Sequence, residues 1–165
     1  MRITTTIGLL LLLAGAVVAV TVWWDREGEP GETKPVMWRI DTADVSTFEL
    51  RHIAGVSRRF ERQGDGWSEG DNARIDAALL LLAAPEAVRR LPPDGNATAD
   101  YGLDPPLLEI ALGGPDTTTT IKVGDATPDG SQRYVHRDGD DAVFLVAKSW
   151  FEALMLLLPD AKAAR

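Results

Sequence analysis

The pattern of hydrophobic residues begins with an apolar run that no charge interrupts, residues 7–24. As a helix this run would be about 27 Å long, which is close to the ~30 Å hydrocarbon core of a bilayer. Trp23 and Trp24 end the run, where aromatic residues of the membrane interface are expected. The pattern therefore predicts one transmembrane helix within residues 1–24, with membrane contact from Ile7 to Trp24.

Charges on either side of this run predict its orientation. Arg2 and the amino terminus are positive, whereas residues 25–35 hold four acids, two glycines and two prolines. The positive-inside rule then places the N-terminus in the cytoplasm, with 25–35 as a flexible acidic linker on the other side. A cleaved signal peptide with Ala14-Gly15-Ala16 as its small-residue site is the alternative. Apolar sequence continues well beyond that site, which favours the anchor.

From Val36 onward the pattern becomes that of short β-strands. Residues 45–53 alternate, with Phe48 and Leu50 expected in the core, and residues 107–112 place Leu108, Ile110 and Leu112 on one side. Glycine-rich turns separate neighbouring runs at 64–66, 113–116 and 138–141. The expected strands are 36–40, 45–53, 56–63, 86–91, 107–112, 117–123, 133–137 and 142–147, with 124–130 as a polar loop.

Two helices are expected among these strands. The first covers Ala77–Ala84, with Asp76 preferred over Asp71 or Asn72 as its N-cap, and it is expected to be largely buried. The second covers 148–158, with Ser149 as its N-cap. Its expected buried row is Trp150, Leu154, Leu157 and Leu158. Because hairpin turns join most neighbouring strands, residues 36–165 are predicted to form an antiparallel α+β domain with two helices packed on the sheet.

Composition excludes several classes of function. The chain has 165 residues, a net charge of -8 and no cysteine. Nucleic-acid binding requires a clustered basic face, so it is not expected. Disulfides and thiolate chemistry are excluded. Four arginines in the first strands suggest a solvated sheet face, with contact to anionic headgroups as the alternative: Arg51, Arg58, Arg59 and Arg62.

A search for catalytic, cofactor and metal motifs is negative. His52 and His136 lie in strand patterns and are expected to be half-exposed strand residues. Residues 138–141 suit a hairpin turn better than a calcium loop. Asp129, like Asp125, is expected to stabilise a turn, with Arg133 nearby. We therefore expect no catalytic residues, no cofactor and no metal; a hydrolase would need a carboxylate pair such as Asp104 and Asp125.

The most constrained stretch of the domain is Tyr101-Gly102-Leu103-Asp104-Pro105-Pro106. Gly102 can adopt a positive φ, and the two prolines fix their own φ and donate no backbone hydrogen bond. The stretch is predicted to end a helical or turn-like segment and to start a strand at Leu107. It is interpreted as a structural corner and not as a catalytic site.

An ordered series of motifs resembles a known family. Residues 101–106 are followed by Val123-Gly124-Asp125-Ala126-Thr127-Pro128-Asp129-Gly130 and then by Tyr134, with Trp67, the helix led by Asp76 and the strand around Val88 upstream. This series, over about 36–158, resembles the bacterial family of domain of unknown function 4340 (DUF4340). The resemblance implies a single-span extracytoplasmic protein. Some relatives look like auxiliary components of ABC-type transport systems, including systems linked to gliding motility, although they are often longer.

These observations predict a membrane-anchored, non-catalytic interaction domain of the bacterial cell envelope. Its partner would be an envelope protein, and an ABC-type transporter is the example that the resemblance implies. The alternative is an extracytoplasmic binding module for a small molecule or a cell-wall glycan, with Trp67, Tyr101 or Tyr134 as stacking platforms. The motif residues that we expect to matter for interaction or structure are Tyr101, Gly102, Asp104, Pro105, Pro106, Gly124, Asp125 and Tyr134.

Overall fold

The computed structural model describes residues 36–91, 97–115 and 117–158. Residues 35–165 make a compact unit. It contains eight described strands: β1 Thr47–His52, β2 Ser57–Gln63, β3 Gly66–Trp67, β4 Arg89–Leu91, β5 Leu108–Gly113, β6 Thr118–Ala126, β7 Gln132–Arg137 and β8 Val143–Ala147. Its described helices are α2 Asn72–Ala83, α3 Ala97–Asp100 and α4 Lys148–Met155.

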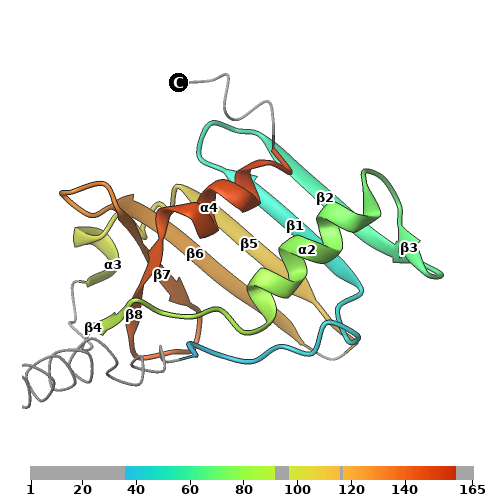
Figure 1. Ribbon diagram of the computed structural model, residues 1–165, viewed down its shortest axis with the longest axis horizontal. Coiled ribbons are helices and arrows are strands. Elements are labelled where there is room, and N and C mark those ends of the chain that lie inside the picture. The colour runs from blue at the N-terminus through green and yellow to red at the C-terminus, as the bar shows by residue number, and fades with distance from the viewer. Residues whose placement is uncertain (1–35, 92–96, 116, 159–165) are drawn as a thin grey trace, which may run out of the picture. The chain divides into compact units, whose positions relative to one another are not determined.

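The eight strands form one antiparallel sheet in the order β3-β2-β1-β5-β6-β7-β8-β4. Strands β5 to β8 are consecutive neighbours, as hairpin connections favour. The earlier strands flank this meander on both sides, because β1 pairs with β5 and β4 pairs with β8. Helix α2 connects β3 at one edge to β4 at the other, and it crosses one face of the sheet together with α4 (Figure 1). The predicted antiparallel α+β fold is confirmed.

The core lies between this face of the sheet and the two helices. Phe48 and Leu50 on β1 are buried, as alternation predicted, and Phe60 on β2 is buried beside them, with the Phe48 and Phe60 ring centroids 5.6 Å apart. From β5, the core receives Leu108, Ile110 and Leu112. From α4 and its C-terminal extension, it receives the predicted row Trp150, Leu154, Leu157 and Leu158. With a core of its own, a unit of about 130 residues can fold alone.

Helix α2 begins earlier than the sequence pattern predicted. Its N-cap is Asp71, whose carboxylate accepts a hydrogen bond from the Ala73 N–H at 3.0 Å. The prediction of Asp76 as N-cap was wrong, since Asp76 lies inside the helix and accepts a hydrogen bond from Trp67 Nε1 at 3.0 Å. The expectation that the helix is largely buried was also wrong, because only Ile75, Ala78, Leu79 and Leu82 are buried and Leu80 is 68% exposed.

Four further expectations need correction. Residues 36–40 are not a regular strand; Val36 makes a single bridge to Glu86, and the segment then follows the end of α2. Strand β6 continues through Gly124 and Asp125, which were assigned to a loop, because a register shift between Val123 and Ala126 absorbs them. Helix α4 has no side-chain cap, so Ser149 does not cap it. His52 is buried rather than half-exposed.

The opposite face of the sheet carries a network of ion pairs. Arg51 contacts Glu49 at 2.6 Å and Glu109 at 3.1 Å, and Arg59 contacts Glu61 at 3.1 Å and Glu49 at 3.8 Å. The hydrogen bond to Glu49 raises the pKa of Arg51 above its usual value. These two arginines therefore meet three carboxylates, and this face carries no excess of positive charge.

The other two arginines of the first strands behave differently. Arg62 donates to the Val45 carbonyl and lies 4.7 Å from the centroid of the Trp67 ring. Arg58 is exposed. The four arginines therefore do not form a single basic patch.

The predicted anchor and linker, with Trp23 and Trp24, lie outside the described residues. Among the described helices, none has the length and apolar character needed to cross a membrane.

Candidate functional site

The structure brings the two motif segments of the sequence into direct contact. The Asp125 N–H donates to the Tyr101 carbonyl at 2.9 Å, and Gly102 lies against both Gly124 and Asp125. Gly102 has a φ of +66°, which glycine adopts without steric cost. A Cβ on Gly124 would collide with the Tyr101 carbonyl oxygen. These glycines allow the corner after α3 to lie directly on the backbone of β6.

Aromatic stacking holds the same corner against β7. The Tyr101 and Tyr134 rings are parallel to within 16°, with centroids 4.3 Å apart. Both rings pack against a second small cluster around Leu103 and Val143. Each tyrosine thus has one ring face covered by the other. This stacking joins the motif segment at 101–106 to β7.

The remaining motif residues take little part in the contact between the corner and β6 and β7. Asp104 and Pro105 are exposed, and their peptide bond is cis. Pro106 is half-buried and makes a bridge with Leu103. Asp125 is exposed as well, so Asp104 and Asp125 do not form the desolvated carboxylate pair on which acid–base catalysis depends.

The turn after β6 is fixed by Asp129. Its carboxylate accepts hydrogen bonds from the Thr127 hydroxyl and from the hydroxyl and N–H of Ser131. The bond from Thr127, followed by those from Ser131, lowers the pKa of Asp129 to about 2. The predicted role of Asp129 in stabilising a turn is confirmed. Arg133, expected nearby, instead donates from Nη1 to the Gly124 carbonyl at 3.0 Å.

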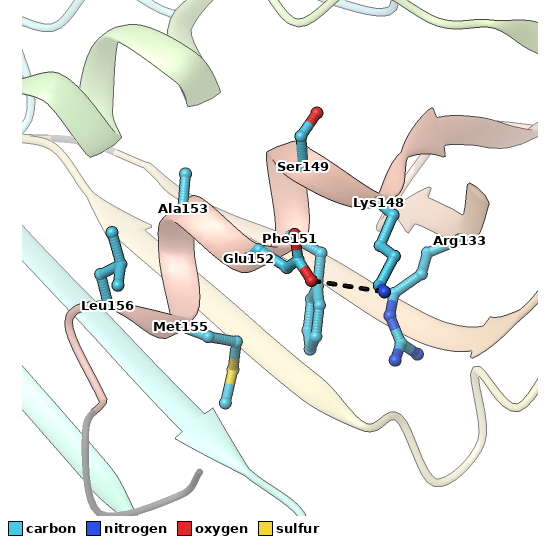
Figure 2. Close-up of a pocket in the computed structure, with 8 residues that line it drawn as sticks. All are labelled: Arg133, Lys148, Ser149, Phe151, Glu152, Ala153, Met155 and Leu156. Atoms are coloured by element: carbon cyan, nitrogen blue, oxygen red, sulfur yellow. Dashed lines mark ion pairs between the residues drawn. The ribbon is translucent and has the colours of Figure 1, made fainter. Parts of the chain in front are cut away.

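A hollow lies beside α4 and was not anticipated from the sequence. We call it the α4 hollow; it has a volume of about 510 Å³. Figure 2 shows Arg133 and Lys148 at one end, Phe151 and Glu152 in the middle, and Met155 and Leu156 at the other end. One end of the hollow is therefore basic and the other is apolar.

Two contacts define the basic end of the α4 hollow. The Arg133 guanidinium lies 4.2 Å from the centroid of the Phe151 ring, a cation–π geometry that fixes its position. Lys148 Nζ lies 3.5 Å from Glu152 Oε1, and both of these side chains are more than half exposed. An exposed pair of this kind is weak, so the Lys148 ammonium can turn to another carboxylate at little cost.

The sequence analysis did not predict this hollow. The only apolar row that it predicted on α4 is the one that contains Trp150 and Leu154, which faces the core. Phe151 and Met155, four residues apart, make a second apolar row beside the first. That spacing was the available signal, but Arg133 comes from β7 and its contribution depends on the tertiary fold.

The aromatic residues proposed as stacking platforms are mostly covered. Trp67 is buried, and Arg62 lies over its ring. Tyr101 and Tyr134 cover each other. The histidines are part of the framework: His52 Nδ1 accepts a hydrogen bond from the Ala54 N–H, and His136 Nε2 lies 2.9 Å from the Asp140 carbonyl oxygen. Within the described ranges, no group of acidic and histidine side chains is arranged to hold a metal ion.

Comparison with known families supports the motif resemblance. The family model described as a domain of unknown function (DUF4340) matches residues 69–160, more than half of the chain. The chain belongs to the DUF4340 family. No curated protein and no solved structure gives a significant match. The DUF4340 match covers the span from α2 to α4, including the corner, Gly124 and the α4 hollow, whereas β1, β2 and Trp67 precede it.

Proposed function

We propose that this DUF4340 protein is a membrane-anchored, non-catalytic interaction domain of the bacterial cell envelope. In this proposal the α4 hollow binds a segment of a partner protein that carries apolar side chains and a carboxylate. The observation on which the proposal depends is the polarity of the hollow, basic at Arg133 and Lys148 and apolar at Met155 and Leu156. Leu156 is 66% exposed, which leaves a large apolar side chain available for contact.

The binding chemistry follows from this polarity. An apolar side chain placed against Met155 and Leu156 would remove apolar surface from water, which gives about 25 cal/mol per Å² buried. A carboxylate at the other end would meet the Lys148 ammonium and the Arg133 guanidinium, whose position the Phe151 ring already fixes. Charge-assisted hydrogen bonds of this type are stronger than those between neutral groups, and they also fix the direction in which a bound segment lies.

The sequence supports the membrane part of the proposal. The charge-free run 7–24 is long enough to span a bilayer, and the acidic linker 25–35 follows it. We place the protein in the inner membrane with one span and its C-terminal domain on the outer side. A role beside an ABC-type transporter is what the DUF4340 resemblance adds, and a transporter subunit is then the expected kind of partner.

A small anionic molecule is the second candidate for the α4 hollow. The volume of about 510 Å³ falls in the range of small-molecule sites, roughly 300–1,000 Å³. Such a ligand would bind the purified protein and raise its melting temperature without any partner protein.

Site-specific photo-crosslinking in living cells tests the protein-partner proposal. A photoreactive amino acid at position 152 probes the hollow, and the same group at Thr120 on the opposite face is the control. We expect one discrete protein adduct from position 152 and none from position 120. Leu156→Glu should reduce this adduct about tenfold, because a charge replaces an exposed apolar contact at the apolar end of the hollow.

Leu80→Glu is the matched control, since Leu80 is exposed to the same degree but lies on α2. Equal loss of the adduct in both variants, or an adduct that forms equally well from position 120, would refute the assignment of the hollow as the contact surface.

A further inference from the structure

The β4 edge of the sheet combines exposed apolar and basic side chains. Val88, Arg89 and Arg90 are all exposed, and Val88 is 44% exposed. Val36 is 42% exposed and joins this edge through its bridge to Glu86. We call Val36, Val88, Arg89 and Arg90 the β4-edge patch. Figure 1 shows β4 at the outer edge of the sheet, beside β8.

The two arginines of the patch differ from those of β1 and β2 in their partners. Arg51 and Arg59 lie among glutamates, whereas Arg89 and Arg90 form no ion pair within the described part of the chain. Glu86, the acid closest in sequence, is exposed and carries one negative charge against the two positive charges of the arginines. In a chain with a net charge of -8, this leaves a local site of positive charge that an external anion can use.

The register of β4 places the two guanidinium groups on opposite sides of the sheet edge. Arg89 pairs with Leu145 and Arg90 with Phe144, and successive side chains of a strand point to opposite faces. A flat anionic surface that meets the sheet edge-on can therefore contact both. Long arginine side chains can also bend so that their charged ends reach one plane.

The position of Val36 in the chain indicates what that surface is. Residues 25–35 separate Val36 from Trp24, the end of the proposed anchor. A chain of this length reaches roughly 40 Å at most. The patch thus includes the point where the linker enters the domain, so contact with the same bilayer costs little additional entropy. Of the observations given for this patch, only the linker length depends on the anchored topology proposed above.

From these observations we propose that the β4-edge patch binds an anionic phospholipid surface. The two guanidinium groups would pair with headgroup phosphates in the bidentate geometry that arginine favours. Val36 and Val88 would enter the headgroup region, where apolar side chains leave water. This contact would set the orientation of the domain on the membrane and leave the α4 hollow as a separate surface.

Vesicle co-sedimentation of residues 35–165 tests the proposal without the anchor. Circular dichroism first confirms that this fragment and each variant unfold cooperatively. The fragment should bind vesicles of phosphatidylcholine with phosphatidylglycerol, and it should not bind phosphatidylcholine alone. Arg89→Gln with Arg90→Gln should lower the partition coefficient about 30-fold, or about fivefold for each arginine near the surface. Binding of the native fragment should weaken in 1 M salt, where the screening length falls to about 3 Å.

A charge-matched double variant gives the control. Arg58→Gln with Arg74→Gln removes the same charge from β2 and α2, away from the β4 edge. This variant should retain its binding to anionic vesicles to within about twofold, because salt screens charges that lie far from the bound membrane surface. Equal loss in both double variants, equal binding to the two vesicle types, or no binding of the native fragment would overturn the proposal. Aggregation of the β4 variant with unchanged vesicle binding would show that the arginines only protect a sheet edge.

These outcomes are independent of the partner-protein proposal. Loss of the photo-adduct at position 152 would leave vesicle binding unaffected, and loss of vesicle binding would leave the α4 hollow intact. If the full-length chain proves to lack an anchor, the fragment experiment still decides whether the patch binds lipid.

Discussion

At the scale of single residues, Gly124 explains why two distant motifs belong together. It lies on β6 where the Tyr101 carbonyl meets the strand, and the Asp125 N–H beside it donates to that carbonyl. The sequence indicated that Gly102 can adopt a positive φ and that Gly124 belongs to the second motif of the family series. It did not indicate that the two glycines touch, since nothing local in the chain encodes a contact between residues so far apart.

Gly124→Ala should destabilise the protein by about 1–3 kcal/mol, because the new Cβ would meet backbone atoms of Tyr101 and Gly102 that cannot move freely. Chemical denaturation measures this loss. Hydrogen exchange at the Asp125 amide should also accelerate as its bond to Tyr101 breaks. Gly139→Ala is the control: it carries the strain of a φ of +91° but has open space around it, so exchange at Asp125 should not change. Unchanged Asp125 exchange in Gly124→Ala would refute the contact.

At the scale of elements, the strands were predicted better than the helix ends. Alternation located β1 and β5 to within a few residues because each has one face in the core, whereas β2 has a single buried residue, Phe60. The start of helix α2 was predicted too late in the chain because the prediction was based on the run of leucines. Its buried face begins at Ile75 and continues through Leu79 and Leu82 at helical spacing. Counting from Ile75 would have identified Asp71 as the cap.

Asp71→Ala should cost about 1 kcal/mol of stability by removing the N-cap hydrogen bond of α2, and Asp71→Ser should restore most of it. Thermal or urea denaturation measures both changes. Ser149→Ala should change stability by less than about 0.5 kcal/mol, because α4 has no side-chain cap to lose. The opposite ranking, with Ser149 more important than Asp71, would contradict the helix boundaries described here.

At the scale of the whole molecule, the two faces of the sheet differ in composition and in exposure to solvent. One face holds the core beneath α2 and α4, and the other presents the ion pairs around Glu49 to solvent. The turns expected at 113–116 and 138–141 allowed the pairings of β5 with β6 and of β7 with β8 to be anticipated. The pairings β1 with β5 and β4 with β8 could not be, because no turn joins those strands. The α4 hollow and the β4-edge patch depend on such long-range arrangements, and for that reason neither was predicted.

Glu49→Gln tests how much the ion-pair network contributes. Glu49 pairs with both Arg51 and Arg59 on a solvated face, so its neutralisation should lower the melting temperature by only about 1–3 °C in dilute buffer. The difference should nearly vanish in 1 M NaCl, where surface charges are screened. Thr118→Val, on the same sheet and away from these pairs, should show no such salt dependence. A large effect that persists in salt would mean that the network is a structural requirement.

The central position of β1 has a consequence for synthesis of the protein. Strand β1 needs β5 as its second neighbour, and some forty residues of chain separate β3 from β5. At about 5–20 residues per second, a ribosome takes a few seconds to add them. During that interval Phe48 and Phe60 have no finished core to bury them, so the nascent β1–β2 hairpin is the part of the chain that most needs a holding chaperone.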